Sequence, residues 1–237
     1  MNLLIVFLFG FTILVGTIIV LCLKNDKKIS ELSISIAFSV LLFLIFLELI
    51  PEALEHLKYM EVLMYVVIGL FSLKILDLFI PEHDHTKNKS HILHIGMVAS
   101  IALILHNIIE GMALYTTLQN HFNLGILLGI GVGLHNIPMG MIVASTLKEA
   151  KYNNKKIVLI SSLISLSTII GALVISLIGN VSEYALGIML SLTLGMIIYI
   201  VFFELMHHIK HQDKKNNLIG FLIGTVIILI SLLFHSH

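Results

Sequence analysis

The chain has 237 residues, of which 58% are hydrophobic and 12% charged, and its mean hydropathy is +1.04. These values exclude an ordinary soluble domain and predict an integral membrane protein with a single transmembrane domain over residues 1–237. The 14 acidic residues balance 14 lysines without any basic tract, so the composition also argues against nucleic acid as a partner.

Apolar segments separated by polar breaks predict an all-α fold with eight transmembrane helices in the lipid bilayer. The first segment has no basic residues before it and no small-residue cleavage site after it, so we expect it to be retained rather than removed as a signal peptide. The eight segments cover residues 3–23, 32–55, 58–80, 94–118, 124–147, 157–179, 183–207 and 217–234.

The lysines predict how the chain is oriented. Twelve of the 14 follow the first, third, fifth and seventh segments. Because positively charged loops stay in the cytoplasm, we expect both termini outside the cell and the protein in the plasma membrane. Residues 81–93 then form a cytoplasmic loop, whose histidines, among them His83 and His85, are suited to transient metal capture. An ordinary solvated loop explains the same composition.

The second and seventh segments share the pattern Phe-x-Glu-Leu near their ends, which contains Glu48 and Glu204. Since the two segments cross the membrane in opposite directions, the shared pattern indicates an inverted repeat, as in many secondary transporters. Both glutamates are candidates for a permeation path. Each also lies close enough to the end of its segment for the carboxylate simply to reach the membrane interface.

Two polar motifs lie near the middle of the fourth and fifth segments. An ionisable side chain at this depth costs about 2.5–3.5 kcal/mol, so such groups usually face a protein interior or an ion path. In a helix, the i and i+4 spacing places the histidine and the glutamate of the first motif on one face, and the second motif repeats the spacing with methionine. The motifs are His106-Asn107-Ile-Ile-Glu110-Gly111 and Gly133-Leu-His135-Asn136-Ile-Pro138-Met139-Gly140.

We therefore expect the two helices to direct imidazole, carboxylate, amide and thioether groups towards a common centre. Imidazole and carboxylate are ligands of zinc and ferrous iron. Pro138 should kink the fifth helix, because it leaves the carbonyl of Leu134 without its usual donor. Gly125, Gly129 and Gly133 recur at four-residue intervals and predict a groove for a neighbouring backbone.

With the Glu-Leu-x-Pro-Glu pattern that closes the second segment and the eight spans, these motifs resemble the ZIP (Zrt/Irt-like) family of divalent metal transporters, most of all its bacterial zinc and iron importers. The resemblance covers essentially the whole chain. It implies a 3+2+3 arrangement with inverted repeats and import of zinc, or of iron or manganese, without a prosthetic group or chemical turnover. It also implies alternating access, in which a bundle containing the fourth and fifth helices moves against the rest.

By the same resemblance, His106, Glu110 and His135 are ligands of a primary metal site, and Asn107 and Asn136 belong to a second site. A homodimer is one assembly that the resemblance allows.

The chain departs from the family in its carboxylates. Met139 stands where bacterial relatives usually have a bridging carboxylate, Asn136 where they often have one, and Thr168 where the sixth helix tends to carry a glutamate. Each lost anion weakens the compensation of a cation's charge in a low-dielectric site. We therefore expect one good site and a second that is weak or missing. The thioether favours softer ions over manganese.

Three other functions use the same residues. The missing carboxylates make a metal-binding sensor without transport a reasonable alternative. A haem electron-transfer protein with His106 and His135 as axial ligands is another, although Glu110 suits a buried macrocycle poorly. An intramembrane metalloprotease is disfavoured, because the order His-Glu-x-x-His does not occur in the sequence.

Overall fold

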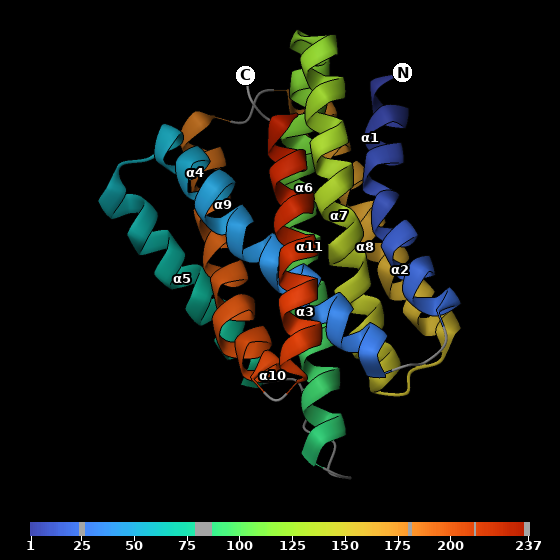
Figure 1. The fold of residues 1–237 in the computed structure, drawn as a ribbon. Helices are drawn as coiled ribbons and strands as arrows, with labels where there is room; N and C mark the ends of the chain where they lie inside the picture. Colours follow the sequence, from blue (N-terminus) through green and yellow to red (C-terminus); the bar gives the residue numbers. More distant parts are fainter. Residues whose placement is uncertain (24–26, 79–86, 180–181, 211, 235–237) are drawn as a thin grey trace.

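The computed structural model describes residues 1–23, 27–78, 87–179, 182–210 and 212–234. For residues 76–78 and 87–95 it describes the backbone only. Figure 1 shows a bundle of long helices, with both chain termini at the same end. In the part of the chain that the structure describes, the elements in order are α1 (Asn2–Gly10), α2 (Thr12–Cys22), α3 (Lys27–Leu44), the π-helical turn η1 (Ile45–Leu49), α4 (Ile50–His56), α5 (Tyr59–Leu78), α6 (Lys87–Asn120), α7 (Phe122–Glu149), α8 (Asn154–Ile178), α9 (Glu183–Tyr199), the π-helical turn η2 (Ile200–Leu205), α10 (Met206–Ile209) and α11 (Lys214–Leu233).

The all-α, multi-pass membrane fold predicted from the sequence is confirmed. Seven helical stretches among the described residues are long and apolar enough to cross a membrane. The remaining predicted span corresponds to α5, which is 20 residues long. The first span is interrupted at Phe11, between α1 and α2, where the carbonyl of Gly10 accepts a hydrogen bond from Ser165 Oγ at 3.0 Å.

One boundary differs from the prediction. Helix α6 begins at Lys87, so residues 87–93 of the predicted loop 81–93 are helical. The physical reason is that this segment contains no glycine or proline, and nothing therefore ends the helix where the apolar sequence ends. His83 and His85 lie outside the described residues.

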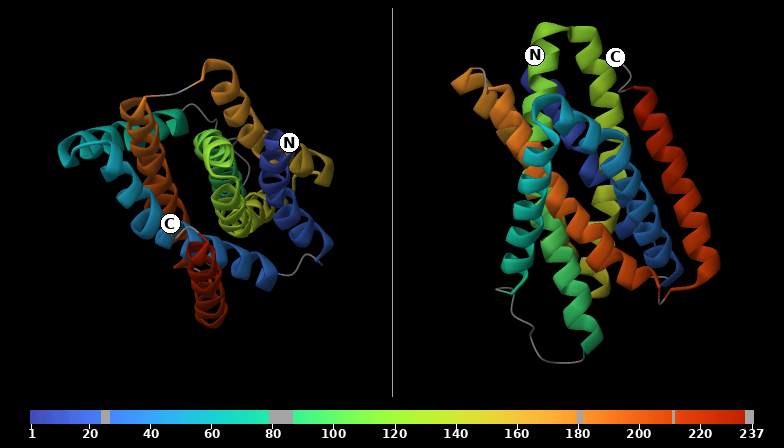
Figure 2. Two further views of the ribbon diagram at one scale, coloured as in Figure 1. Left: turned by 90° about the horizontal axis from the view of Figure 1, so that it is seen from above. Right: turned by 90° about the vertical axis from the view of Figure 1, so that its left-hand side faces the viewer.

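The helices form two groups, which the left view of Figure 2 separates. In the first, called here the α6/α7 group, α6 packs along α7 and α8, α2 packs along α7, and α1 joins α8. In the second, the α3/α9 group, α11 packs along α3, α5 along α9, and α4 beside α9. Seen from above, α5 and α9 lie on the opposite side of α6 from α1 and α8.

Within the α6/α7 group, glycines let helices touch backbone to backbone. A Cβ atom at Gly16 of α2 would collide with the carbonyl of Ile137 in α7. Between α6 and α8 the same contact joins Gly171 to the carbonyl of Ile108. Buried hydroxyls add to this packing. The group is therefore held by contacts that tolerate almost no change in side-chain size.

The α3/α9 group uses the same device. A Cβ at Gly69 of α5 would collide with the carbonyl of Leu192 in α9, and one at Gly224 of α11 would press on the carbonyl of Ile36 in α3. Polar side chains also join α3 to α11: Ser35 Oγ donates to Asn217 Oδ1 at 2.9 Å, and the hydroxyls of Ser39 and Thr225 lie 3.0 Å apart. Each of these four glycine contacts joins two helices of the same group.

These contacts repeat along the chain at constant spacing. The contact of Gly171 with Ile108 has a counterpart in the contact of Gly16 with Ile137. The two isoleucines are 29 positions apart, and the two glycines are 155 positions apart. In the same way Gly111 and Gly140, also 29 positions apart, each abut the backbone of a neighbouring helix. Hence α6 corresponds to α7, and the three spans before α6 correspond to the three after α7.

The π-helical turns follow the same rule. Glu48 lies in η1 and Glu204 lies 156 positions later in η2. The chain runs towards the end that bears the termini in α3–α4 and away from it in α9–α10 (Figure 1). The inverted repeat predicted from the Phe-x-Glu-Leu patterns is thus present, and each repeat has a widened turn at its glutamate.

Two local predictions concern α7. The helix is continuous from Phe122 to Glu149 with Pro138 inside it, and the kink at this proline stays a prediction. The glycine groove receives a backbone at one of its three positions: a Cβ at Gly125 would press on the Cα of Leu118 in α6, whereas at Gly129 the neighbour is the ring of Phe9 in α1. A flat ring fills the space that a glycine leaves as well as a second helix does, and the four-residue spacing does not distinguish the two.

Candidate metal centre

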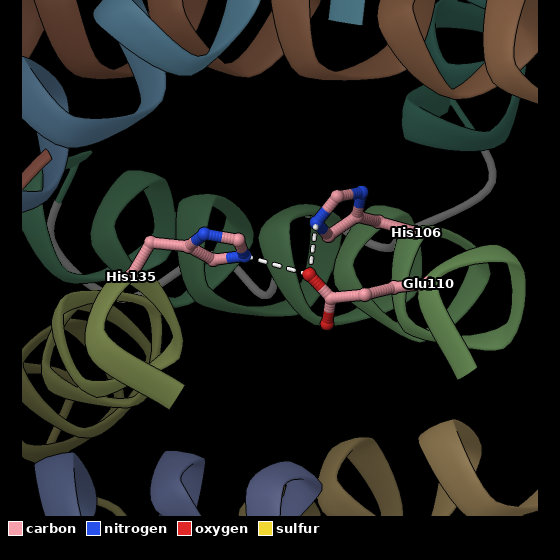
Figure 3. A group of neighbouring side chains, drawn as sticks. All are labelled: His106, Glu110 and His135. Atoms are coloured by element: carbon pink, nitrogen blue, oxygen red, sulfur yellow. Dashed lines mark hydrogen bonds and ion pairs between the residues drawn. The ribbon is translucent and has the colours of Figure 1, made fainter. Parts of the chain in front are cut away.

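His106, Glu110 and His135 meet between α6 and α7. Each offers one ligand atom, and these three atoms lie within 4.8 Å of one another. Glu110 Oε1 is 2.6 Å from His135 Nε2 and 3.7 Å from His106 Nε2, so the carboxylate lies between the two imidazoles (Figure 3). The structure therefore brings together the three predicted ligands that carry an imidazole or a carboxylate.

The three side chains are largely buried. His135 is fully buried and His106 is 4% exposed. The second carboxylate oxygen of Glu110 accepts a hydrogen bond from Asn136 Nδ2 at 3.2 Å. Liganding atoms around a tetrahedral zinc ion are about 3.3 Å apart, as follows from zinc–ligand bonds of about 2.0–2.1 Å. The separations of Glu110 Oε1 from the two imidazole nitrogens, 2.6 and 3.7 Å, lie on either side of that value, so side-chain movements of about an ångström suffice to surround an ion.

The predicted second site consists of neutral groups. Asn107 donates Nδ2 to the carbonyl of Ile164 at 3.2 Å. The side-chain oxygens of Asn107, Asn136 and Thr168 are buried and have no hydrogen-bond partner among the described residues. They can accept from water or face a cation, but none carries a charge. Met139 belongs to the buried apolar cluster, and its role as a ligand stays a prediction.

A cavity of about 340 Å³ leads to the centre from the end at which both termini lie. Its walls come from both helix groups, so it lies at the seam between them. The lining residues are, from the α3/α9 group, Leu47, Glu48, Leu49, Pro51, Glu52, Glu55, Leu190, Leu232 and Phe234, and, from the α6/α7 group, His106, Ile109, Glu110, Ala113, Thr117, Leu124, Leu127, Leu128 and Val132.

The cavity includes functional candidates that the sequence interpretation did not single out. Glu52 and Glu55 continue the wall begun by Glu48. The spacing i, i+4, i+7 places the three carboxylates on one helical face, and this periodicity was the available signal. Glu48 lines the same cavity as His106 and Glu110. A cation in this cavity would meet acidic groups along its whole path to the centre.

Glu204 is not part of this cavity. It lies in η2 and is 6% exposed. It therefore does not join the centre in this conformation, although its counterpart Glu48 lines the open cavity.

The chain matches a known family and several named relatives. The family described as "ZIP Zinc transporter" matches residues 81–232. The chain is 28% identical to the zinc transporter ZupT of Chlorobaculum parvum, with 97% of each chain covered. It is 28% identical to ZupT of Enterobacter sp., covering 82% of this chain and 80% of the relative, and 27% identical to ZupT of Campylobacter jejuni, covering 94% and 92%. The similarity thus extends over most of the chain.

Proposed function

The chain belongs to the ZIP family of zinc transporters, and we propose that it carries divalent cations, zinc before iron or manganese, into the cytoplasm. The observation that carries this proposal is the buried trio of His106, Glu110 and His135, of which His106 and Glu110 line a cavity between two helix groups. An ion held there is shielded from lipid and reachable from one side of the membrane. In the proposal these three residues are the ligands of one primary site.

The direction follows from the lysines. If the lysine-rich loops are cytoplasmic, the end with the termini and the open cavity faces outwards. Cations then approach from outside along Glu48 and reach Glu110. Alternating access needs the two helix groups to shift against each other, and the seam between them is where the cavity lies. Asn107, Asn136 and Met139 are proposed as weaker, neutral contacts.

The geometry favours this function over a haem protein. The Glu110 carboxylate occupies the space between His106 and His135, where an iron macrocycle would need to lie. A metal sensor that does not transport would use the same three residues. An uptake experiment distinguishes such a sensor from a transporter.

That experiment is uptake by sealed liposomes. We expect the purified protein to carry external zinc to a zinc-sensitive dye inside, well above the leak of protein-free liposomes, because the cavity joins the aqueous phase to the trio. The assay is repeated with ferrous, manganous and cuprous ions to rank them. Saturable zinc binding without movement of any of these ions would identify a sensor and contradict the proposal.

Changing Asn136→Asp should raise zinc affinity about tenfold or more. It places a second carboxylate 3.2 Å from Glu110, which better compensates a dication but repels Glu110 when no ion is bound. The melting temperature should fall without metal and rise more than that of the wild type when zinc is added. Asn136→Ala is the control, since it removes the hydrogen bond without adding charge. Equal zinc affinity in wild type and Asn136→Asp would show that position 136 does not face the ion.

A further inference from the structure

The outer part of the cavity, called here the mouth, is acidic. Glu52 and Glu55 of α4 line it, and Glu55 is exposed. Among the described residues that line the cavity, the single imidazole is that of His106, which is 4% exposed and belongs to the buried trio. Within this lining, carboxylates at the mouth therefore have no imidazole beside them with which to share a zinc ion.

Two further histidines enter the chain at the mouth. Phe234, directly after α11, lines the same cavity as Glu52 and Glu55. Residues 235–237 follow it with the sequence His-Ser-His and lie outside the described residues. Three residues extend the chain by at most about 10–11 Å, so both imidazoles are tethered to the wall of the cavity.

These four side chains form a set of zinc ligands. In α4 the three-residue spacing places Glu52 and Glu55 on one face. Residues two apart lie on the same side of an extended segment, which allows His235 and His237 to act together. Two carboxylates neutralise a dication, and imidazole favours zinc over magnesium or calcium, which prefer oxygen ligands alone.

Two described histidines lie at the same end of the protein, and neither is among the residues that line the cavity. His56 Nδ1 lies 2.6 Å from Glu183 Oε2, so this imidazole is already paired on α9. His121 forms the connection between α6 and α7. The segment after Phe234 is therefore the source of imidazole that the chain places next to the acidic wall.

We propose that Glu52, Glu55, His235 and His237 form a zinc capture site at the mouth of the cavity. Its role as the first stop of a transported ion rests on the proposed function, whereas binding itself needs no transport. Because Glu55 is exposed, water and salt screen its charge, and the capture site should hold zinc less tightly than the buried trio. Further in, the next imidazole is His106, whose Nε2 has no hydrogen-bond partner among the described residues.

Zinc binding to the purified full-length Glu110→Ala protein tests the proposal, because this variant lacks the carboxylate of the primary site. We expect one zinc ion per chain to remain bound. His235→Ala with His237→Ala should weaken this binding about tenfold or more, since half of the ligands are lost. Glu52→Gln with Glu55→Gln should act in the same way.

The matched control is His207→Ala with His208→Ala. These residues lie in α10, at the end opposite the termini (Figure 1), and the double change removes the same number of histidines. It should leave the zinc affinity of the Glu110→Ala protein unchanged. If both pairs of histidines weaken binding alike, the zinc is bound without a specific site at the mouth, and the proposal is wrong.

A spin label gives a second readout in protein with Glu110 intact. In a Cys22→Ser background, Ser236→Cys carries a nitroxide and keeps both neighbouring histidines. Zinc should slow the motion of the nitroxide, whereas magnesium should not. Glu52→Gln with Glu55→Gln should abolish the response to zinc, because the segment then has no carboxylates to bridge to.

Three results would overturn the capture site: no zinc bound by Glu110→Ala, binding that survives the loss of His235 and His237, or a nitroxide that zinc does not slow. The outcome is independent of the uptake assay. If the wild type carries zinc while any of these results is found, the capture site is assigned wrongly and the transport function stands. If no ion is carried but both readouts respond as expected, the capture site exists and the transport proposal fails.

Discussion

Zinc uptake should fall on the order of a hundredfold or more when Glu110→Ala is introduced. Glu110 is the single carboxylate of the trio and approaches both imidazoles, at 2.6 and 3.7 Å. Its loss leaves a dication with only neutral ligands in a buried site, where an uncompensated charge costs about 3–5 kcal/mol. Asn136 also loses the acceptor of its hydrogen bond. The measurement is initial zinc uptake into dye-loaded liposomes at equal protein content.

Two controls separate charge from fold. Glu110→Gln keeps the shape and should be nearly as inactive, because only the charge is removed. Glu61→Gln changes a carboxylate at the end of the protein that bears the termini. Glu61 accepts a hydrogen bond from the backbone amide of Lys58 and is not among the residues that line the cavity. It should retain wild-type uptake. Uptake by Glu110→Ala within threefold of the wild type would rule out Glu110 as a necessary ligand.

The second large effect concerns packing. Gly171→Ala should lower the melting temperature in detergent by about 5 °C or more, since overpacking a tight contact costs about 1–3 kcal/mol. The new Cβ would collide with the carbonyl of Ile108, which is backbone and cannot rotate away. Helix α6 would be pushed from α8 within one turn of Glu110. Zinc uptake should therefore fall together with stability, although Gly171 touches no ligand.

Gly133→Ala is the matched control for this change. Gly133 is also a glycine in the middle of a spanning helix, but a Cβ there would meet the methyl group of Thr12 at 3.3 Å. A side chain can yield by a few tenths of an ångström, and alanine is the better helix former. Its melting temperature should stay close to that of the wild type. If both alanines melt alike, the backbone contact between α6 and α8 is not what stabilises the group.

The sequence predicted that His106, Glu110 and His135 lie close together, because the information needed for this is local. His106 and Glu110 share a face by helical spacing, and the matched motif puts His135 at the same depth on the next helix. Two adjacent helices in the chain then have few ways to bring these residues together. The inverted repeat was also visible, but only through one short pattern around Glu48 and Glu204.

The rest depended on contacts between distant parts of the chain. Nothing in the segment from Glu48 to Glu55 shows that its acidic face borders α6, since that requires the position of one helix group against the other. The spacing of Met139 from His135 suggested a ligand, and the structure adds that Met139 lies in the buried apolar cluster, which periodicity alone does not show. Periodicity gives a residue its face on a helix but does not name the neighbour of that face.

The pairing of helices also sets an order of assembly during synthesis. All members of the α6/α7 group have been made once α8 emerges. The α3/α9 group is different, because α3, one of the earliest helices, packs along α11, the last. Until then the hydroxyls of Ser35 and Ser39 lack Asn217 and Thr225 as partners. Since membrane helices insert before they associate, the group that contains His106, Glu110 and His135 can mature on the ribosome while the other waits for chain release.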